Sequence, residues 1–249
     1  TVKAKDVTEH QLATMMVGRE VTLRVARAAA ATGAGICAVS NLRLLNARGG
    51  DVCKDLSLTV KAGEILGLVG VEGNGQAEVM EAIAGLRHVH DGRIAVSGQD
   101  IVPMSVLQRR DIGIASIPED RIAAGLATGA TVAENIVATR LKDDRYVRRG
   151  ILDLRAIKAN AAKLIEQFSI RVNGPGVPVG TLSGGNMQKV VVARELSEQP
   201  KLLLVSQPTR GVDLGATQVI WKTIAAARDA GAAVLLSSAD LSELLALSD

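Results

Sequence analysis

Residues 182–189 read Leu-Ser-Gly-Gly-Asn-Met-Gln-Lys, and this octapeptide constrains the fold more than any other stretch of the chain. Ser183, Gly184 and Gly185 stand where a loop is expected to turn into a helix that runs from Asn186 onward. The first turn of a helix exposes unpaired N–H groups and the positive end of the helix dipole, so it suits a phosphate. Two glycines let a phosphate oxygen approach the backbone, and a serine hydroxyl adds a donor. For Ser-Gly-Gly alone, a capped helix without a ligand is the alternative.

A second glycine-rich loop follows an apolar stretch, residues 64–70, that is suited to a buried strand. Residues 70–77 then read Gly-Val-Glu-Gly-Asn-Gly-Gln-Ala, and the next residues predict a helix with its apolar side at Val79, Met80, Ile83 and Leu86. Strand, glycine loop and helix are the required context of a P-loop, whose consensus is Gly-x-x-x-x-Gly-Lys-Ser/Thr. The candidate nucleotide contacts are Gly70, Glu72, Gly73, Asn74, Gly75, Gln76 and Ala77.

Two P-loop positions have lost their usual chemistry. Gln76 stands at the lysine position and Ala77 at the Ser/Thr position. The lysine would bring a positive charge to the β- and γ-phosphates, and the hydroxyl would bind Mg²⁺. Glutamine can still donate a hydrogen bond, whereas alanine cannot bind a metal. Backbone amides could still hold a phosphate, and a glycine turn without any ligand is the competing interpretation.

Together the two motifs resemble those of ATP-binding cassette (ABC) ATPases, with the Leu-Ser-Gly-Gly-Asn signature of simple-sugar and nucleoside importers. The resemblance implies an α/β fold, a P-loop NTPase of the ABC ATPase type. Such a fold has a mixed sheet with helices on both faces, an antiparallel β subdomain and a helical subdomain. We expect the ABC domain over residues 33–249 and its helical subdomain at about 125–180, with helices at Thr131–Asn135 and Asp153–Phe168.

Three further family positions have lost their usual chemistry, and a fourth has the form typical of the sugar and nucleoside branch. Residues 202–209 read Leu-Leu-Leu-Val-Ser-Gln-Pro-Thr, so Ser206 and Gln207 replace the acids that the family uses for Mg²⁺ and for the attacking water. Ala239 stands where active members carry a histidine that contacts the γ-phosphate. Glu119, in the segment Pro-Glu-Asp-Arg, takes the place of the Q-loop glutamine, as in the sugar and nucleoside branch.

The resemblance therefore implies a domain with a degenerate site of its own and an intact signature. We expect no catalytic residue in cis and no metal ligand. The signature would act in trans, completing the Mg-ATP site of a partner domain, through Ser183, Gly184, Gly185 and Gln188. This pattern is similar to the C-terminal half of tandem importer ATPases. The implied partners are the first ABC domain of the same polypeptide or a second copy, transmembrane permease subunits and, indirectly, an extracytoplasmic solute-binding protein. The implied location is the cytoplasmic face of the cell membrane, peripherally bound.

Composition agrees with one α/β domain. The chain has 249 residues, of which 47% are hydrophobic and 1% aromatic, so aliphatic side chains must form the core. No apolar run reaches the roughly 18–20 residues that span a bilayer.

Cys37 and Cys53 indicate neither a disulfide framework nor a metal site. The net charge of +3 is weak support for nucleic acid, and the basic cluster over 140–149 is typical of a solvated surface. Asp91-Gly92 predicts a hairpin turn.

The two ends of the chain suggest a piece of a longer protein. Residues 1–32, with a capping box at Thr8 and Gln11, are similar to the tail and linker of a preceding ABC domain. At the other end, the family would continue beyond Asp249, so we expect a truncated C-terminus.

Three other functions compete with this interpretation. One is a catalytically active ABC ATPase of the same importer family. Another is a non-transport ABC protein that acts on nucleic acid or the ribosome, but such proteins keep the lysine and both acids. The third is an interaction scaffold without nucleotide. We expect no nucleic acid partner.

Overall fold

The computed structural model describes residues 32–46, 48–71 and 73–249. The predicted capping box at Thr8 and Gln11, nearly all of the predicted linker, and Glu72 of the P-loop lie outside the described residues. Among the described residues, no helix is both long and apolar enough to cross a membrane.

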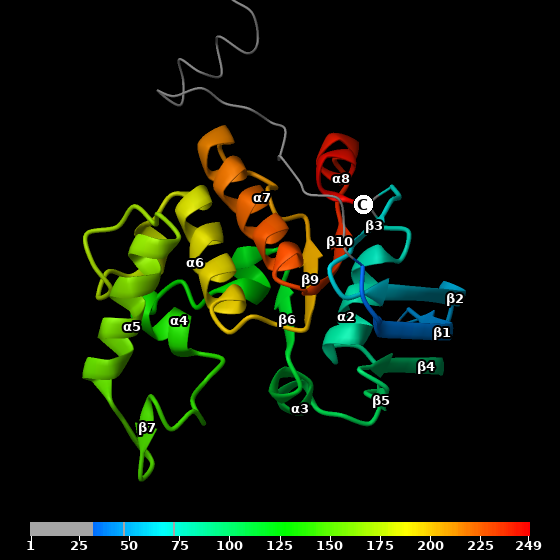
Figure 1. Cartoon of the computed structure of the whole chain (residues 1–249), viewed down its shortest axis with the longest axis horizontal. Coiled ribbons are helices and arrows are strands. Elements are labelled where there is room, and N and C mark those ends of the chain that lie inside the picture. Colours follow the sequence, from blue (N-terminus) through cyan, green and yellow to red (C-terminus); the bar gives the residue numbers. More distant parts are fainter. Residues whose placement is uncertain (1–31, 47, 72) are drawn as a thin grey trace, which may run out of the picture.

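A parallel sheet of four strands forms the centre of the molecule, in the order β3-β10-β9-β6 (Figure 1). These strands are β3 (Ile65–Leu68), β10 (Ala233–Ser237), β9 (Leu202–Ser206) and β6 (Ile114–Ile117). All three pairings are parallel, and β9 and β10 are buried along their whole length. Near-continuous aliphatic strands of this kind are expected where both faces of a sheet are covered. Because the strands are parallel, their carboxyl ends meet at one edge, where ligands bind in such sheets.

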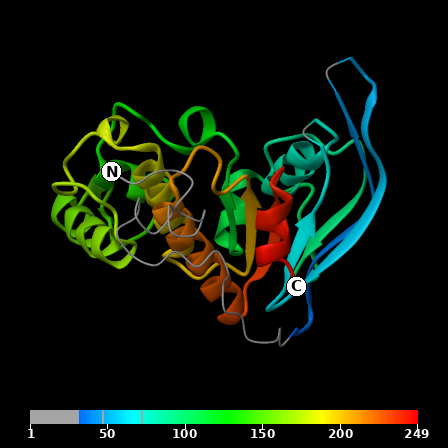
Figure 2. The same ribbon diagram turned by 90° about the horizontal axis from the view of Figure 1, so that it is seen from above.

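Successive residues of the central strands pack into two different cores, because side chains alternate across a strand. Leu203 and Val205 of β9 pack with α6 (Gly184–Leu196), α7 (Leu214–Asp229) and the helical part of the chain. Leu202 and Leu204 pack on the opposite face with α2 (Gln76–Ala84) and with an antiparallel sheet. Figure 2 shows α7 and α2 on opposite sides of the strands.

The antiparallel sheet has the order β2-β1-β4-β5, with β1 (Gly35–Leu45), β2 (Asp51–Lys61), β4 (Asp91–Val96) and β5 (Gln99–Asp100). The predicted hairpin turn at Asp91-Gly92 is wrong, because both residues begin strand β4. Gly92 has a φ of +98°, and a Cβ there would lie 2.6 Å from the backbone oxygen of Asn41. The glycine is needed because strand β1 passes directly over it.

The P-loop helix α2 is shorter than the sequence pattern suggested. It ends at Ala84, and Gly85 follows in the left-handed conformation with a φ of 85°. Leu86, predicted to lie on its buried side, is therefore outside the helix and 65% exposed. Val79, Met80 and Ile83 are buried, as expected, together with Ala82 and Ala84.

Residues 126–182 hold two helices joined by irregular segments. The chain forms α4 (Val132–Val137), a short hairpin of β7 (Val147–Arg148) and β8 (Ile151–Leu152), α5 (Leu154–Gln167) and a 3₁₀ turn, η3 (Val179–Thr181). Thr131 begins α4 in a capping box with Glu134, and Asp153 caps α5. The β7–β8 hairpin had no sequence signal. The remaining elements are α3 (Val106–Asp111), the π-helical turn η2 (Arg121–Gly125) and α8 (Leu241–Leu247).

Candidate nucleotide-binding site

The predicted P-loop follows β3 and enters α2 at the carboxyl edge of the parallel sheet. Gly75 is the residue before the helix, with a φ of 97°, and no side chain caps the helix start. A Cβ on Gly75 would lie 2.8 Å from the Val52 oxygen of strand β2. The loop therefore needs glycine here, and the N–H groups of the first turn of α2 are left for a phosphate.

The side chain of Gln76 lies across this loop. A Cβ added to Gly70 would be 1.8 Å from Gln76 Nε2, so the amide covers the backbone at Gly70. Ala77 is exposed, as are Gly73 and Asn74. A phosphate in this loop would meet a neutral amide in place of an ammonium group and would have to displace it from Gly70.

The end of strand β9 holds two altered positions, Ser206 and Gln207, and Gln207 contacts a third, Ala239. Gln207 follows β9 with a φ of 47°, and its backbone N–H donates to the Ser237 oxygen at 2.8 Å. Its side-chain Oε1 accepts a hydrogen bond from the backbone N–H of Ala239 at 3.1 Å. The glutamine is thus tied to the loop after β10, where the family carries its histidine. The sequence did not reveal this contact between the Gln207 side chain and the backbone of residue 239.

A cleft of about 580 Å³ brings together Ala77, Ser206, Glu119 and Arg210. Glu119 and Arg210 form an ion pair across it. Ser206 is 8% exposed, and its short side chain replaces the expected carboxylate. No group of three His, Cys, Asp or Glu side chains in the described parts of the chain could hold a metal. The residues here do not fit the Mg²⁺ that the family uses, because neither metal-binding position carries its ligand.

The signature lies at the start of α6. This helix begins two residues earlier than the sequence indicated. The helix begins at Gly184, and the Ser183 hydroxyl accepts a hydrogen bond from the Asn186 N–H. Ser183 is exposed and its own hydroxyl hydrogen can donate to a ligand. Gly185 is tightly packed, since a Cβ there would be 2.8 Å from the Ala216 Cβ. Gln188 is only 2% exposed, so its side chain lies inside the domain and not on the signature surface.

Arg121 lies beside the signature, a position that its place in Pro-Glu-Asp-Arg did not suggest. Its Nη1 donates to the Arg210 oxygen at 2.7 Å and its Nη2 to the Gly211 oxygen at 3.3 Å. A Cβ on Gly184 would be 2.8 Å from Arg121 Nη2. The guanidinium and the helix start therefore add their positive potentials at the same place.

The P-loop and the signature are separated within the chain. In both Figure 1 and Figure 2, strands β6 and β9 stand between α2 and α6. The two motifs therefore lie at different places on the molecule.

Restoring the lysine and hydroxyl should strengthen the P-loop. We expect Gln76→Lys with Ala77→Ser to tighten Mg-ATP binding about 10- to 100-fold, because a hydrogen bond to a charged group contributes about 1.5–3 kcal/mol. Equilibrium titration with a fluorescent ATP analogue measures the change. Gln99→Lys, on the exposed strand β5, adds the same charge elsewhere and is the matched control. Equal binding by the repaired and control proteins would show that residues 70–77 do not act as a P-loop.

We compared the chain with known protein families and proteins. The profile of a family described as "ABC transporter" matches residues 53–210. The guanosine import ATP-binding protein NupO of Bacillus subtilis (strain 168) is 39% identical over 249 residues, which are 100% of this chain and 49% of that protein. The nucleoside import ATP-binding protein NupA of Lactococcus lactis subsp. cremoris (strain MG1363) is 41% identical, with the same coverage. The glucose import ATP-binding protein TsgD13 of Haloferax volcanii is 41% identical over 251 residues, 46% of its length. The chain spans about half the length of the curated relatives it matches.

Solved structures agree on the fold. A nucleotide-free ATP-binding cassette from an ABC transporter superposes with a TM-score of 0.73 and 21% identity, over 87% of this chain and 86% of that one. An ATP binding subunit of an ABC transporter gives a TM-score of 0.70 at 22% identity, over 86% of this chain and 83% of that one. The predicted fold class is therefore confirmed, and the chain belongs to the ABC transporter family.

Proposed function

We propose that this chain is the second nucleotide-binding half of an importer ATPase for nucleosides or simple sugars. It gives its signature, Ser183, Gly184 and Gly185, to the ATP site of a partner ABC domain, while its own P-loop site does not hydrolyse ATP. The partner is the first ABC domain of the same polypeptide or a second copy. The assembly sits on the cytoplasmic face of the membrane with permease subunits, and a solute-binding protein delivers the substrate to them. The relatives, named for the import of guanosine, nucleosides and glucose, support this class.

One contrast carries the proposal. The signature end keeps an exposed serine, Gly184 at the helix start with a guanidinium beside it, and Gly185, which has no room for a side chain. The P-loop end has a neutral amide over Gly70, an alanine at a metal position and no carboxylate after β9. A domain of this kind can complete a site on another domain but lacks the groups for hydrolysis at its own.

The active-ATPase alternative requires chemistry that the described residues do not supply. Gln207 is held by the Ala239 N–H and carries no charge, so it cannot act as a general base. The nucleic acid alternative is not favoured by any contact in the described structure.

Turnover measurements test the proposal. We expect the purified chain alone to hydrolyse Mg-ATP no faster than a mock purification, because loss of one general base costs about 10²–10⁴-fold and several groups are missing here. Addition of a matching first ABC domain should bring turnover that depends on both proteins. A coupled ATPase assay measures both reactions. Turnover by the chain alone at the ordinary enzyme rate of about 1–10³ s⁻¹ would overturn the proposal.

A further inference from the structure

The β7–β8 hairpin and the start of α5 expose three aliphatic side chains close together. Ile151 is 72% exposed, Leu152 is 44% exposed and Leu154 is 62% exposed. Ile151 and Leu152 form strand β8, and Leu154 is the first residue of α5. Single exposed aliphatic side chains are ordinary, but three within four residues form an exposed apolar patch at the tip of the hairpin.

Exposed cations surround this tip. Arg148 and Arg149 precede it in the hairpin, Arg155 follows it, and all three are exposed. Across the described residues, none of these three arginines forms an ion pair with a carboxylate. Asp153, the acid between Leu152 and Leu154, accepts hydrogen bonds from the N–H groups of Ala156 at 3.0 Å and Arg155 at 3.1 Å, so it serves as the helix cap. The pKa of Asp153 lies below its usual value because of these N–H groups, first that of Ala156, and of the charges of Arg148 and Arg155.

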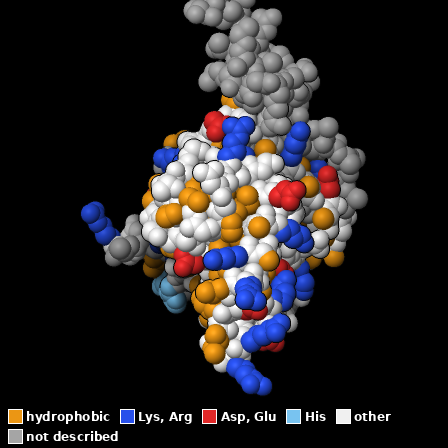
Figure 3. Space-filling view, turned by 90° about the vertical axis from the view of Figure 1, so that its left-hand side faces the viewer, with side chains coloured by type: hydrophobic (Ala, Val, Ile, Leu, Met, Phe, Trp, Pro, Cys, Tyr) orange, Lys and Arg blue, Asp and Glu red, His pale blue; other side chains and the backbone are white. Residues whose placement is uncertain are grey.

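The hairpin stands at an end of the molecule. Figure 1 shows it at the lower end of the helical part, away from the parallel sheet. Figure 3 views that side, and Lys and Arg side chains gather over its lower half with hydrophobic side chains beside them. A protruding tip with high exposure suits a broad, soft surface better than a peptide that needs a groove.

We propose that this hairpin patch, Arg148, Arg149, Ile151, Leu152, Leu154 and Arg155, docks on an anionic lipid surface. The arginines pair with lipid phosphates and carboxylates, for which the planar guanidinium is well shaped. The aliphatic side chains enter the boundary between headgroups and acyl chains, as in other peripheral proteins that combine apolar and basic residues. This contact is independent of the nucleotide function proposed above, because it needs neither ATP nor a permease.

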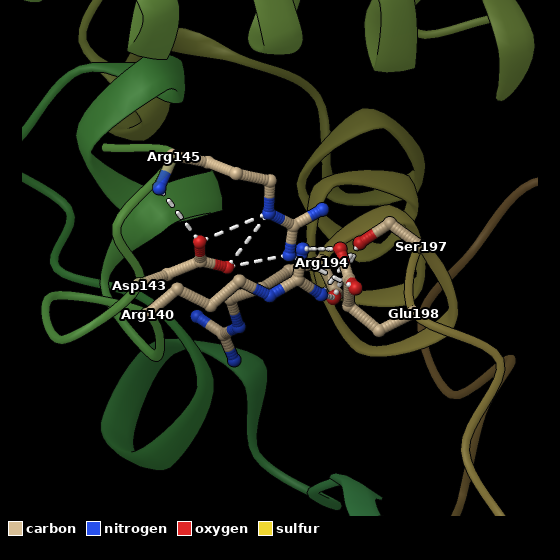
Figure 4. A network of polar contacts seen from close by, with 6 residues as sticks. All are labelled: Arg140, Asp143, Arg145, Arg194, Ser197 and Glu198. Atoms are coloured by element: carbon tan, nitrogen blue, oxygen red, sulfur yellow. Dashed lines mark hydrogen bonds and ion pairs between the residues drawn. The ribbon is translucent and has the colours of Figure 1, made fainter. Parts of the chain in front are cut away.

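The hairpin patch is also connected to the signature helix. Arg145, just before the hairpin, binds Asp143 in its own loop and Glu198 beyond the end of α6, the latter at 3.0 Å (Figure 4). Arg140 binds Glu198 at 2.6 Å and the Ser197 hydroxyl at 2.7 Å. The loop before the hairpin is therefore clamped to the C-terminal end of α6, whose first residues are Gly184 and Gly185. A lipid contact at the hairpin would fix the orientation of the helix that presents the signature.

Vesicle binding tests the proposal with the chain as it stands. We expect binding to phosphatidylcholine vesicles that contain phosphatidylserine, weaker binding without phosphatidylserine, and release at high salt. The variant Arg148→Gln/Arg149→Gln/Arg155→Gln should bind about 100-fold more weakly, since each basic residue near an anionic surface is worth about fivefold in affinity. Ile151→Ser/Leu154→Ser should also reduce binding. Co-sedimentation measures the bound fraction in each case.

A matched control separates this patch from general basicity. Lys54, Lys61 and Lys222 are exposed and lie on β2 and α7, so Lys54→Gln/Lys61→Gln/Lys222→Gln removes the same charge elsewhere. It should leave vesicle binding within about twofold of the parent, because screening limits such charges to about a Debye length. Equal losses from both triple variants, or unchanged binding by the serine variant, would overturn the proposal.

A reporter residue tests insertion directly. The only tryptophan, Trp221, is 5% exposed, so Leu152→Trp adds a probe at the tip. Its emission should shift to shorter wavelength with phosphatidylserine vesicles and be quenched by brominated lipids. An emission spectrum that vesicles do not change would also overturn the proposal, even if the protein sediments, and would favour a protein partner for the patch.

Discussion

Gly184→Asp is expected to lower ATP hydrolysis at the partner's site by at least about 10²–10³-fold, the loss typical of removing one preorganised donor to a developing negative charge. A Cβ at this position would lie 2.8 Å from Arg121 Nη2 and 3.1 Å from the Gly211 oxygen, so the Arg121 side chain must move away from the helix start. The new carboxylate would also stand where the γ-phosphate approaches, repelling it and pairing with Arg121. Because an acid near a helix start favours the helix, the domain itself should still fold. The measurement is steady-state turnover in an assembly with an intact first ABC domain.

Two companion variants sharpen this test. Ser183→Arg should abolish turnover as well, because it places bulk at the exposed helix start. Gln207→Ala should change turnover less than about threefold, since its side chain is held by the Ala239 N–H and activates no water. Equal losses from Gly184→Asp and Gln207→Ala would mean that this half hydrolyses ATP itself. No loss from any of the three would favour a scaffold without nucleotide contact.

Glu195→Ala is expected to destabilise the domain by about 3–5 kcal/mol, the usual result of breaking a buried ion pair, because it leaves the buried Arg194 without its partner. The Glu195 side chain is fully buried and accepts from Arg110 Nη1 at 3.0 Å and from Arg194 Nε at 2.8 Å. It also accepts from the Ser116 N–H at 3.3 Å, which connects α6 to strand β6. Thermal unfolding should show a midpoint roughly 10 °C lower.

Glu198→Gln is the matched control for this variant. Its side chain is 43% exposed and pairs with Arg140 and Arg145, so removing its charge should cost less than about 1 kcal/mol. A similar loss of stability in both variants would show that the contacts of Glu195 with Arg110 and Arg194 contribute no more than a surface ion pair.

The same residue predicts a dependence on pH. Burial alone would raise the pKa of the Glu195 carboxyl, but Arg194 and Arg110 hold it below its usual value. A group whose pKa is lower in the folded state stabilises above its unfolded pKa of about 4.3, and this contribution is lost as pH falls through the folded pKa. The stability difference between the parent and Glu195→Gln should therefore be constant at neutral pH and shrink on acidification. Urea unfolding at a series of pH values measures it, and a difference that does not change with pH would contradict the argument.

The sequence by itself determined the local features of this protein. The aliphatic runs at residues 202–205 and 233–237 became buried strands, and the helices predicted to begin at Thr131 and Asp153 form directly after these residues. These features depend on periodicity, capping and glycine conformation within a few residues, which a single chain displays directly. The family followed from the same short motifs.

Only the tertiary structure decided which of these motifs contact one another. Gln207 meets Ala239 across 32 residues, and Arg121 reaches the oxygen of Arg210 across 89. No periodicity encodes such contacts, because they depend on the order of strands in the sheet and on the loops at its carboxyl edge. The burial of Gln188 has a related cause: α6 is covered on nearly all sides, so its position in an intact signature could not reveal that its side chain faces inward.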